Sequence, residues 1–254
     1  MDNVHVRFGG IIALAGVSFS VAHGEICGLI GPNGSGKTTL FNCISGIYRA
    51  GQGEIRFEGE PLGRLKRYKI IGRGIGRTFQ NVALFRSMSV RENVLTGAHH
   101  LGRTGFAAHA LALPSARAEA AAREAELREV LAFLELDGVA DVPVSGLPFG
   151  TRKRVEFARA LISRPKLLLL DEPAAGLNHT EVDGLRVLLG RVRAHYTLSI
   201  LLVEHHMALV MQVSEKVVAL EFGAKIAEGT PEAVRNNPAV IRAYLGDAEP
   251  ARAA

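Results

Sequence analysis

Short apolar runs of strand length alternate with longer amphipathic stretches along most of the 254-residue chain. The apolar runs at 25–30, 166–170 and 199–203 have few polar interruptions, which is typical of parallel strands covered on both faces. The alternation therefore predicts an α/β protein. The expected strands are 4–8, 17–21, 25–30, 53–59, 166–170, 199–204, 217–221 and 225–228. The expected helices are 38–45, 90–95, 115–136, 152–162, 181–193 and 207–213, with a short helix after Pro231.

The residue pattern becomes typical of helices from about residue 87 and returns to that of strands near residue 164. We expect a helical subdomain at 87–163, including its last helix, inserted into a core formed by 1–86 and 164–246. Residues 247–254 are expected to be a frayed tail. The longest expected helix begins near Ser115, a candidate cap, and carries one apolar stripe. The stripe is formed by Leu127, Val130, Leu131 and Leu134.

Composition narrows the class of protein but does not identify it. Hydrophobic residues make up 48% of the chain and charged residues 22%, which excludes a disordered chain. No apolar run approaches the roughly 20 residues of a membrane-spanning helix, and no secretory signal is visible, so we expect the protein inside the cell. The net charge of +5 admits nucleic acid or anionic lipid as a partner, although basic and acidic residues are interspersed. Cys27 and Cys43 have apolar neighbours and are expected to be buried free thiols.

A glycine-rich motif follows the predicted strand at 25–30 and opens the next predicted helix. It matches the pattern G-x-x-x-x-G-K-[ST] at every fixed position. Glycines let consecutive backbone N–H groups surround phosphate oxygens, and the helix start adds a positive dipole. The motif therefore predicts ATP binding, with Lys37 at the β- and γ-phosphates and the Thr38 hydroxyl on Mg²⁺. The residues are Gly31, Pro32, Asn33, Gly34, Ser35, Gly36, Lys37 and Thr38, and we add the neighbouring Thr39 to the ATP-binding set.

Two adjacent acids, Asp171 and Glu172, end the apolar strand at 166–170. A buried strand has no structural need for them, and burying unpaired carboxylates is costly. Together with the glycine-rich motif, they predict that Asp171 holds Mg²⁺ and that Glu172 is the general base that activates the attacking water. The strand at 199–203 is followed by Glu204, His205 and His206. A histidine there can hold a γ-phosphate oxygen, but it can equally be a surface residue or cap the helix starting at Met207.

These residues, in this order, resemble the nucleotide-binding subunits of ABC transporters over nearly the whole chain. The resemblance implies that Phe8 stacks on adenine, that Gln80 contacts Mg²⁺ and the attacking water, and that His205 is the switch histidine. It places Asn178 in the D-loop. It places the family signature, which acts on the ATP of a partner subunit, at Leu147, Pro148, Phe149, Gly150 and Thr151. The implied fold is a P-loop ABC ATPase domain with a mostly parallel core sheet, an antiparallel β subdomain and a helical subdomain.

Within that family the chain looks like the longer of the two ATPase subunits of branched-chain amino acid transporters. The likeness rests on residues 76–81 with 84–85, on 172–178 and 226–231, and on 237–238 followed by 243–246. Lipopolysaccharide-export ATPases share part of this combination. The transported solute does not touch such a subunit, so amino acids, amides and urea stay open as substrates.

Three positions depart from the family pattern. Pro148 replaces the signature serine, Thr151 replaces its glutamine, and Asn178 replaces the usual D-loop aspartate. Proline is comfortable at the first position of a helix, so the departure affects the phosphate clamp and leaves the fold intact.

The resemblance implies an ATP hydrolase that uses Mg²⁺ and lies peripherally on the cytoplasmic face of the inner membrane. Its expected partners are a second ABC ATPase subunit, two membrane permease subunits and, indirectly, a periplasmic or extracellular substrate-binding protein. The ATPase partner is expected to be a paralogue in a heterodimer, with a homodimer as the alternative. A different class, an ABC-type ATPase acting on nucleic acid or ribosomes, is disfavoured because the chain has one P-loop and no heptad run, so we expect no nucleic acid partner.

Overall fold

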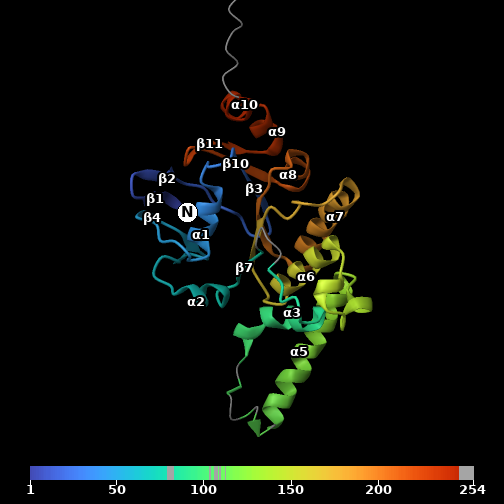
Figure 1. Ribbon diagram of the computed structural model, residues 1–254. Helices are drawn as coiled ribbons and strands as arrows, with labels where there is room; N and C mark the ends of the chain where they lie inside the picture. The colour runs from blue at the N-terminus through green and yellow to red at the C-terminus, as the bar shows by residue number, and fades with distance from the viewer. Residues whose placement is uncertain (79–82, 103, 106–107, 109, 112, 246–254) are drawn as a thin grey trace, which may run out of the picture. The chain divides into compact units, whose positions relative to one another are not determined.

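The computed structural model describes residues 1–78, 83–102, 104–105, 108, 110–111 and 113–245 (Figure 1). The chain forms two compact units. The first combines Met1–Ile70 with Leu167–Ala254, and the second is Ile71–Lys166. The helical subdomain expected at 87–163 falls inside the second unit, which also includes the preceding short strand.

A mostly parallel sheet forms the centre of the first unit, as the apolar runs predict. Its strands follow the order β11-β10-β3-β9-β8, and the pairs β10–β3, β3–β9 and β9–β8 are parallel. Among these five described strands, β11 alone runs antiparallel to its neighbour, β10. β3, β8 and β9 are buried at every position. The strands are β3 (Ile26–Ile30), β8 (Leu167–Asp171), β9 (Ser199–Val203), β10 (Lys216–Glu221) and β11 (Ala224–Gly229).

A second, antiparallel sheet follows the order β2-β1-β4 and corrects two expectations. The strand expected at 17–21 is wrong, because β2 (Ile11–Val17) ends where it was expected to begin. The cause is a two-residue hairpin turn at Gly9 and Gly10, which returns the chain at once from β1 (Asp2–Phe8) and pairs Phe8 with Ile11. The strand expected at 53–59 is divided into β4 (Gln52–Glu54) and β5 (Arg56–Phe57), and β5 pairs with β6 (Glu60–Pro61).

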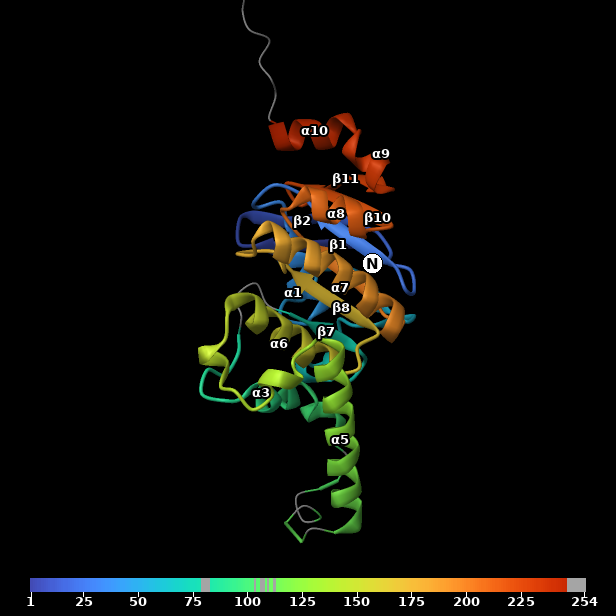
Figure 2. The ribbon, with the colours of Figure 1, turned by 90° about the vertical axis from the view of Figure 1, so that its right-hand side faces the viewer.

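Helices cover both faces of the central sheet in the first unit. Figures 1 and 2 show α1 (Lys37–Ile44) on one face and α7 (His179–Tyr196) with α8 (Met207–Val213) on the other. α1 ends as predicted, with Gly46 in the left-handed region at φ 70°. α7 is longer than the expected 181–193. Of the other described helices, α9 (Pro231–Arg235) and α10 (Pro238–Leu245) belong to this unit, and α2 (Arg67–Ile71) begins in it.

The second unit is built around three packed helices, α3 (Val90–Gly97), α5 (Pro114–Phe133) and α6 (Phe149–Leu161). Close approach of α3 to α6 depends on Gly97, because a Cβ there would lie 1.9 Å from the carbonyl oxygen of Arg159. The unit also contains β7 (Ile75–Arg77) and the short 3₁₀ turns η1 (His99–Leu101), η2 (Asp137–Val139) and η3 (Val144–Gly146).

The apolar stripe of the long helix is confirmed, but its cap is not. Each of the four stripe residues is at most 2% exposed, and burying each such side chain contributes about 1.5–3 kcal/mol. Ser115 does not cap α5, because Pro114 occupies the first helical turn and the cap position falls on Leu113, without a side-chain hydrogen bond. Similarly, α6 begins at Phe149, so Pro148 is its N-cap residue and not its first helical residue.

Candidate functional site

The glycine-rich motif forms the connection between β3 and α1 in the first unit. Gly31, Gly34 and Gly36 have positive φ angles of 151°, 79° and 101°. A Cβ on Gly31 would lie 2.2 Å from the carbonyl oxygen of Leu220, and one on Gly36 would lie 2.6 Å from that of Ala13. A Cβ on Gly34 would meet no heavy atom within 4 Å. Two of the glycines are therefore required by packing, whereas the third faces open space where a ligand can approach.

Lys37, the first residue of α1, is turned back into the loop that precedes it. Its ammonium group donates to the carbonyl oxygens of Gly31 at 2.7 Å and Pro32 at 2.9 Å, and the side chain is largely buried. Burial lowers the pKa of Lys37, while the negative charges of Glu172 and Asp171 raise it. The loop thus holds a cation enclosed by backbone dipoles, next to two carboxylates. Thr38 is exposed and Thr39 half-buried on the first turn of α1.

The two predicted acids lie at the carboxyl end of β8, beside the end of β9. Asp171 is 5% exposed and pairs in register with Val203. The backbone N–H of Glu172 donates to the carbonyl of Val203 at 2.8 Å, and Glu172 has a φ of 49°, an unusual value for a non-glycine residue. This turn directs its carboxylate to His205, whose Nε2 lies 3.0 Å from Oε1 of Glu172. The general-base candidate and the switch-histidine candidate are therefore in contact.

The neighbouring histidine takes the other role that the sequence left open. Nδ1 of His206 accepts a hydrogen bond from the backbone N–H of Leu209 at 3.3 Å and caps α8. The cap and the acid-binding histidine are thus two different residues.

Glu204 is a site residue that sequence reasoning missed. It is 3% exposed, and its carboxylate accepts three backbone hydrogen bonds. Oε1 accepts from the N–H of Ala174 at 2.5 Å, and Oε2 accepts from the N–H groups of His205 and His206 at 3.0 and 3.2 Å. The side chain ties the segment after Glu172 to the segment that carries His205. An acid that ends an apolar strand, as Asp171 does, was the signal in the sequence.

Comparison with known proteins decides the family. A family model described as "ABC transporter" matches residues 14–175, and one described as "Branched-chain amino acid ATP-binding cassette transporter" matches residues 224–250. The chain belongs to the ABC transporter family. It is an ATP-hydrolysing subunit of this type, whose family partners are membrane permeases and whose attachment to the membrane is peripheral. None of the described helices is both long enough and apolar enough to cross a membrane.

Relatives of this ABC transporter ATPase align over nearly its full length. The high-affinity branched-chain amino acid transport ATP-binding protein BraF of Pseudomonas aeruginosa is 42% identical over 98% of this chain and 97% of its own. LivG of Escherichia coli K12, of the same description, is 43% identical with the same coverage. Among solved structures, the ADP conformation of MJ1267, an ATP-binding cassette of an ABC transporter, has a TM-score of 0.83 and 30% identity over 97% of each chain. A nucleotide-free ATP-binding cassette has a TM-score of 0.81 and 30% identity over 97% of this chain and 98% of its own.

The adenine-stacking candidate of the ABC ATPase, Phe8, lies at the end of β1 and is 45% exposed. Its ring meets that of Tyr48 edge-on, with 5.0 Å between ring centroids. Tyr48 is a second residue that sequence reasoning did not identify. The Phe8 ring thus packs against a second aromatic residue.

The D-loop candidate Asn178 has a structural role that an aspartate would fill equally well. It is the N-cap of α7, where its Oδ1 accepts from the N–H of Glu181 at 3.0 Å and Glu181 accepts from the N–H of Asn178 at 2.9 Å. Asparagine and aspartate cap helices about equally well, so the substitution preserves this capping box.

The signature segment lies in the second unit, at the start of α6. Pro148 supplies no side-chain cap, and only its carbonyl accepts, from the N–H of Arg152 at 3.0 Å. The Phe149 ring is 38% exposed and lies within 6 Å of the cationic groups of Arg152 and Lys153. Leu147 is buried, whereas Gly150 and Thr151 are half-buried. The predicted Q-loop residue Gln80 lies outside the described residues.

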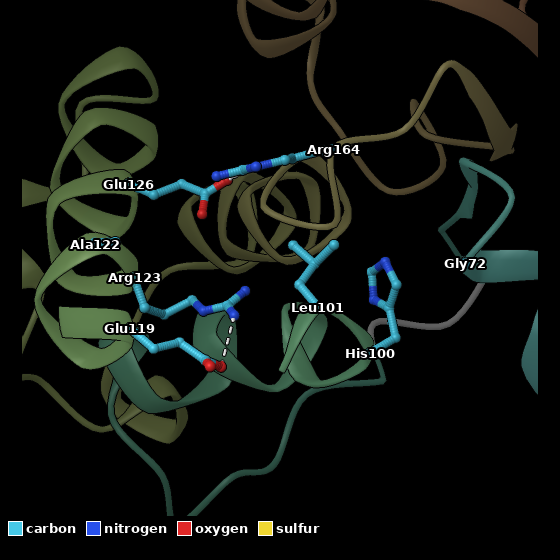
Figure 3. A pocket seen from close by; sticks show the side chains of 8 residues that line it. All are labelled: Gly72, His100, Leu101, Glu119, Ala122, Arg123, Glu126 and Arg164. Atoms are coloured by element: carbon cyan, nitrogen blue, oxygen red, sulfur yellow. Dashed lines mark hydrogen bonds and ion pairs between the residues drawn. The ribbon is translucent and has the colours of Figure 1, made fainter. Parts of the chain in front are cut away.

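A cavity of about 390 Å³ in the second unit was not expected from the sequence (Figure 3). Its wall includes two arginines that are each paired with a glutamate, Arg123 with Glu119 at 3.6 Å and Arg164 with Glu126. This charge balance among the described lining residues argues against a site for an anion. The remaining described lining residues are Gly72, His100, Leu101 and Ala122.

Proposed function

We propose that the chain hydrolyses MgATP to drive the import of branched-chain or other hydrophobic amino acids through a membrane permease. The observation that carries the catalytic part is the contact between Glu172 and His205 at 3.0 Å, at the ends of the strands beside the Lys37 loop. The substrate class rests on the 42–43% identity to branched-chain amino acid transport ATP-binding proteins over 98% of the chain.

The residues of the loop fit a triphosphate. Lys37 would exchange the carbonyl oxygens of Gly31 and Pro32 for phosphate oxygens, which are stronger acceptors because they carry charge. The open space above Gly34 leaves room for the phosphate chain. Phe8 would stack on the adenine, supported by Tyr48.

The same residues fit Mg²⁺ when nucleotide is present. In the described part of the chain no group of three or more His, Cys, Asp or Glu side chains is placed to hold a metal ion. That agrees with Mg²⁺, which is usually held by one or two protein groups together with phosphates and water. Thr38 and Asp171 would hold the ion, and the bound ion would neutralise charge that develops on the phosphates.

In the proposed hydrolytic step, the oxygen of the attacking water bonds to the γ-phosphorus while Glu172 accepts a proton from that water. The bond from that phosphorus to the bridging oxygen breaks, and ADP and phosphate leave. His205 would orient Glu172 and contact the γ-phosphate, so that loss of the phosphate changes its environment.

A Glu172→Gln substitution tests the base assignment. It keeps the size of the side chain but cannot accept the proton, so we expect ATPase turnover to fall by at least about a hundred-fold while ATP binding persists. The measurement is phosphate release and nucleotide binding by the complex assembled with its partners. Glu232→Gln in α9 is the control and should retain full turnover. Full turnover by Glu172→Gln would exclude Glu172 as the base.

We further propose that the ATP site is completed by the signature of a second ATPase subunit, with a paralogue forming the other half of a heterodimer. The complex would lie on the cytoplasmic face of the inner membrane and receive solute from a binding protein. Isolation of the tagged chain from membranes, followed by identification of its partners, tests this assembly. Recovery of a permease and a second ATPase supports it, and recovery of the chain with ribosomes or nucleic acid contradicts it.

Transport by the reconstituted complex tests the substrate class. Labelled leucine, isoleucine and valine should accumulate in vesicles only with ATP and with active Glu172. An amide, urea and a lipopolysaccharide are tested separately as alternative substrates. ATP-dependent movement of one of these without uptake of the amino acids would contradict the proposed substrate.

A further inference from the structure

The C-terminal helix contacts the first residue of the phosphate-binding loop. Tyr244, near the end of α10, accepts a hydrogen bond at its hydroxyl oxygen from the backbone N–H of Gly31, at 2.7 Å. The two residues are 213 positions apart in the sequence. Gly31 is buried, so without this partner its N–H would have to find another or remain unsatisfied at a cost.

Gly31 has little freedom to adjust. Its φ is 151°, and a Cβ would collide with the carbonyl oxygen of Leu220 at 2.2 Å and with the hydroxyl of Ser35 at 2.6 Å. The peptide group before Gly31 donates to Tyr244, and the peptide group after it accepts from the ammonium of Lys37 at 2.7 Å. The two bonds therefore restrain both peptide planes that flank one α-carbon. Rotation of the first plane would move the carbonyl that holds Lys37.

The hydroxyl is presented by an anchored helix. α10 packs against α9 and β11, and Val240 on its buried face is 5% exposed. Oδ1 of Asn237 accepts from the N–H of Ala239 at 2.9 Å and fixes the first turn. Burial raises the pKa of Tyr244, so the phenol stays protonated at neutral pH and acts as a neutral acceptor.

We propose that Tyr244 is a positioning residue for nucleotide binding, through which the C-terminal helix holds the Gly31 peptide and thereby the Lys37 ammonium. This inference rests on the proposed nucleotide site. It gives the C-terminal segment a role in the affinity for nucleotide, although the segment supplies no ligand to the phosphates.

A Tyr244→Phe substitution in the full chain removes only the hydroxyl. The readout is the dissociation constant of N-methylanthraniloyl-ADP, a fluorescent nucleotide that needs neither hydrolysis nor a partner subunit. We expect affinity to weaken about five-fold, the equivalent of about 1 kcal/mol for one net hydrogen bond. Tyr68→Phe in α2 is the matched control, because Tyr68 is 67% exposed, and its affinity should stay within about 1.5-fold of the unaltered chain.

A second measurement follows the Gly31 amide directly. In the unaltered chain, hydrogen exchange at the Gly31 amide, followed by nuclear magnetic resonance, should be slow, and it should accelerate in Tyr244→Phe. Exchange as fast as that of exposed loop amides in the unaltered chain would overturn the proposal. A lowered melting temperature with unchanged affinity would also overturn it, because that is the result of a purely structural bond. If the unaltered chain itself fails to bind the nucleotide, the proposed function fails and not this inference alone.

Discussion

Replacing Glu204 by glutamine should damage both stability and turnover, although the residue touches no proposed substrate atom. The carboxylate accepts three backbone N–H groups in a position that is 3% exposed. Glutamine retains one oxygen. If that oxygen still accepts the hydrogen bonds from the N–H groups of His205 and His206, the new NH₂ group faces the N–H of Ala174. Two hydrogen-bond donors then face each other where a hydrogen bond of 2.5 Å existed.

The magnitude follows from the number of bonds. A hydrogen bond to a charged group contributes about 1.5–3 kcal/mol, and a buried donor left unsatisfied costs about 1–3 kcal/mol. Removing the buried charge offsets part of this loss of stability, because the neutral glutamine avoids the desolvation cost of the carboxylate. We therefore expect a net loss of about 1–3 kcal/mol. Turnover should fall about ten-fold, since the segment that orients His205 against Glu172 loosens.

The chain contains no tryptophan, so urea unfolding is best followed by far-UV circular dichroism. Turnover is measured as phosphate release by the assembled complex. Glu54→Gln is the control, because Glu54 forms an exposed ion pair with Arg56 at 2.6 Å, and its loss should change stability by less than about 1 kcal/mol. A Glu204→Gln variant with unfolding free energy within about 0.5 kcal/mol of the unaltered chain and with full turnover would refute the reasoning.

Two further predictions concern the signature and the cysteines. Pro148→Ser restores a hydroxyl that can cap α6 and face a partner's phosphate; stability should change by less than about 1 kcal/mol, because the gained cap and the more flexible unfolded chain oppose each other. The ATPase rate of the assembled complex should rise by up to about ten-fold, and an unchanged rate would contradict the idea that this signature is weakened. Burial raises the pKa of Cys27 to about 12 and that of Cys43 to about 11, from 9.0, so both thiols stay protonated in the folded chain until the pH exceeds these values. At pH 8 a thiol reagent should therefore label native Cys27 about a thousand-fold and Cys43 about a hundred-fold more slowly than the urea-unfolded chain, and equal rates would contradict the burial.

Much of the fold could be predicted because the signals were local. The runs that became β3, β8 and β9 are apolar almost throughout, and this pattern is typical of a parallel sheet covered on both faces. The β1–β2 hairpin was missed although its signal was also local: two adjacent glycines between apolar positions form a two-residue turn, and the expected strand was placed too late as a result.

The starting positions of α5 and α6, in the second unit, could not be predicted to the residue from the sequence. Ser115 and Pro148 were both plausible starting residues, but one or two positions decide between cap and first turn, and that choice depends on how the preceding segment approaches the helix. The burial of the α5 stripe, in contrast, follows from helical spacing alone.

The sequence by itself determined the chemistry that lies within consecutive residues. Three glycines, a lysine and a threonine in one loop, and two acids at a strand end, specify a phosphate site because these groups act together from fixed spacings. Only the tertiary structure decided which histidine contacts Glu172 and which caps α8, that Glu204 joins two loops, and that Tyr244 reaches Gly31 across 213 positions. The physical reason is that a hydrogen bond requires groups to be close in space, and for groups distant in the sequence that closeness arises only from the packing of the whole unit.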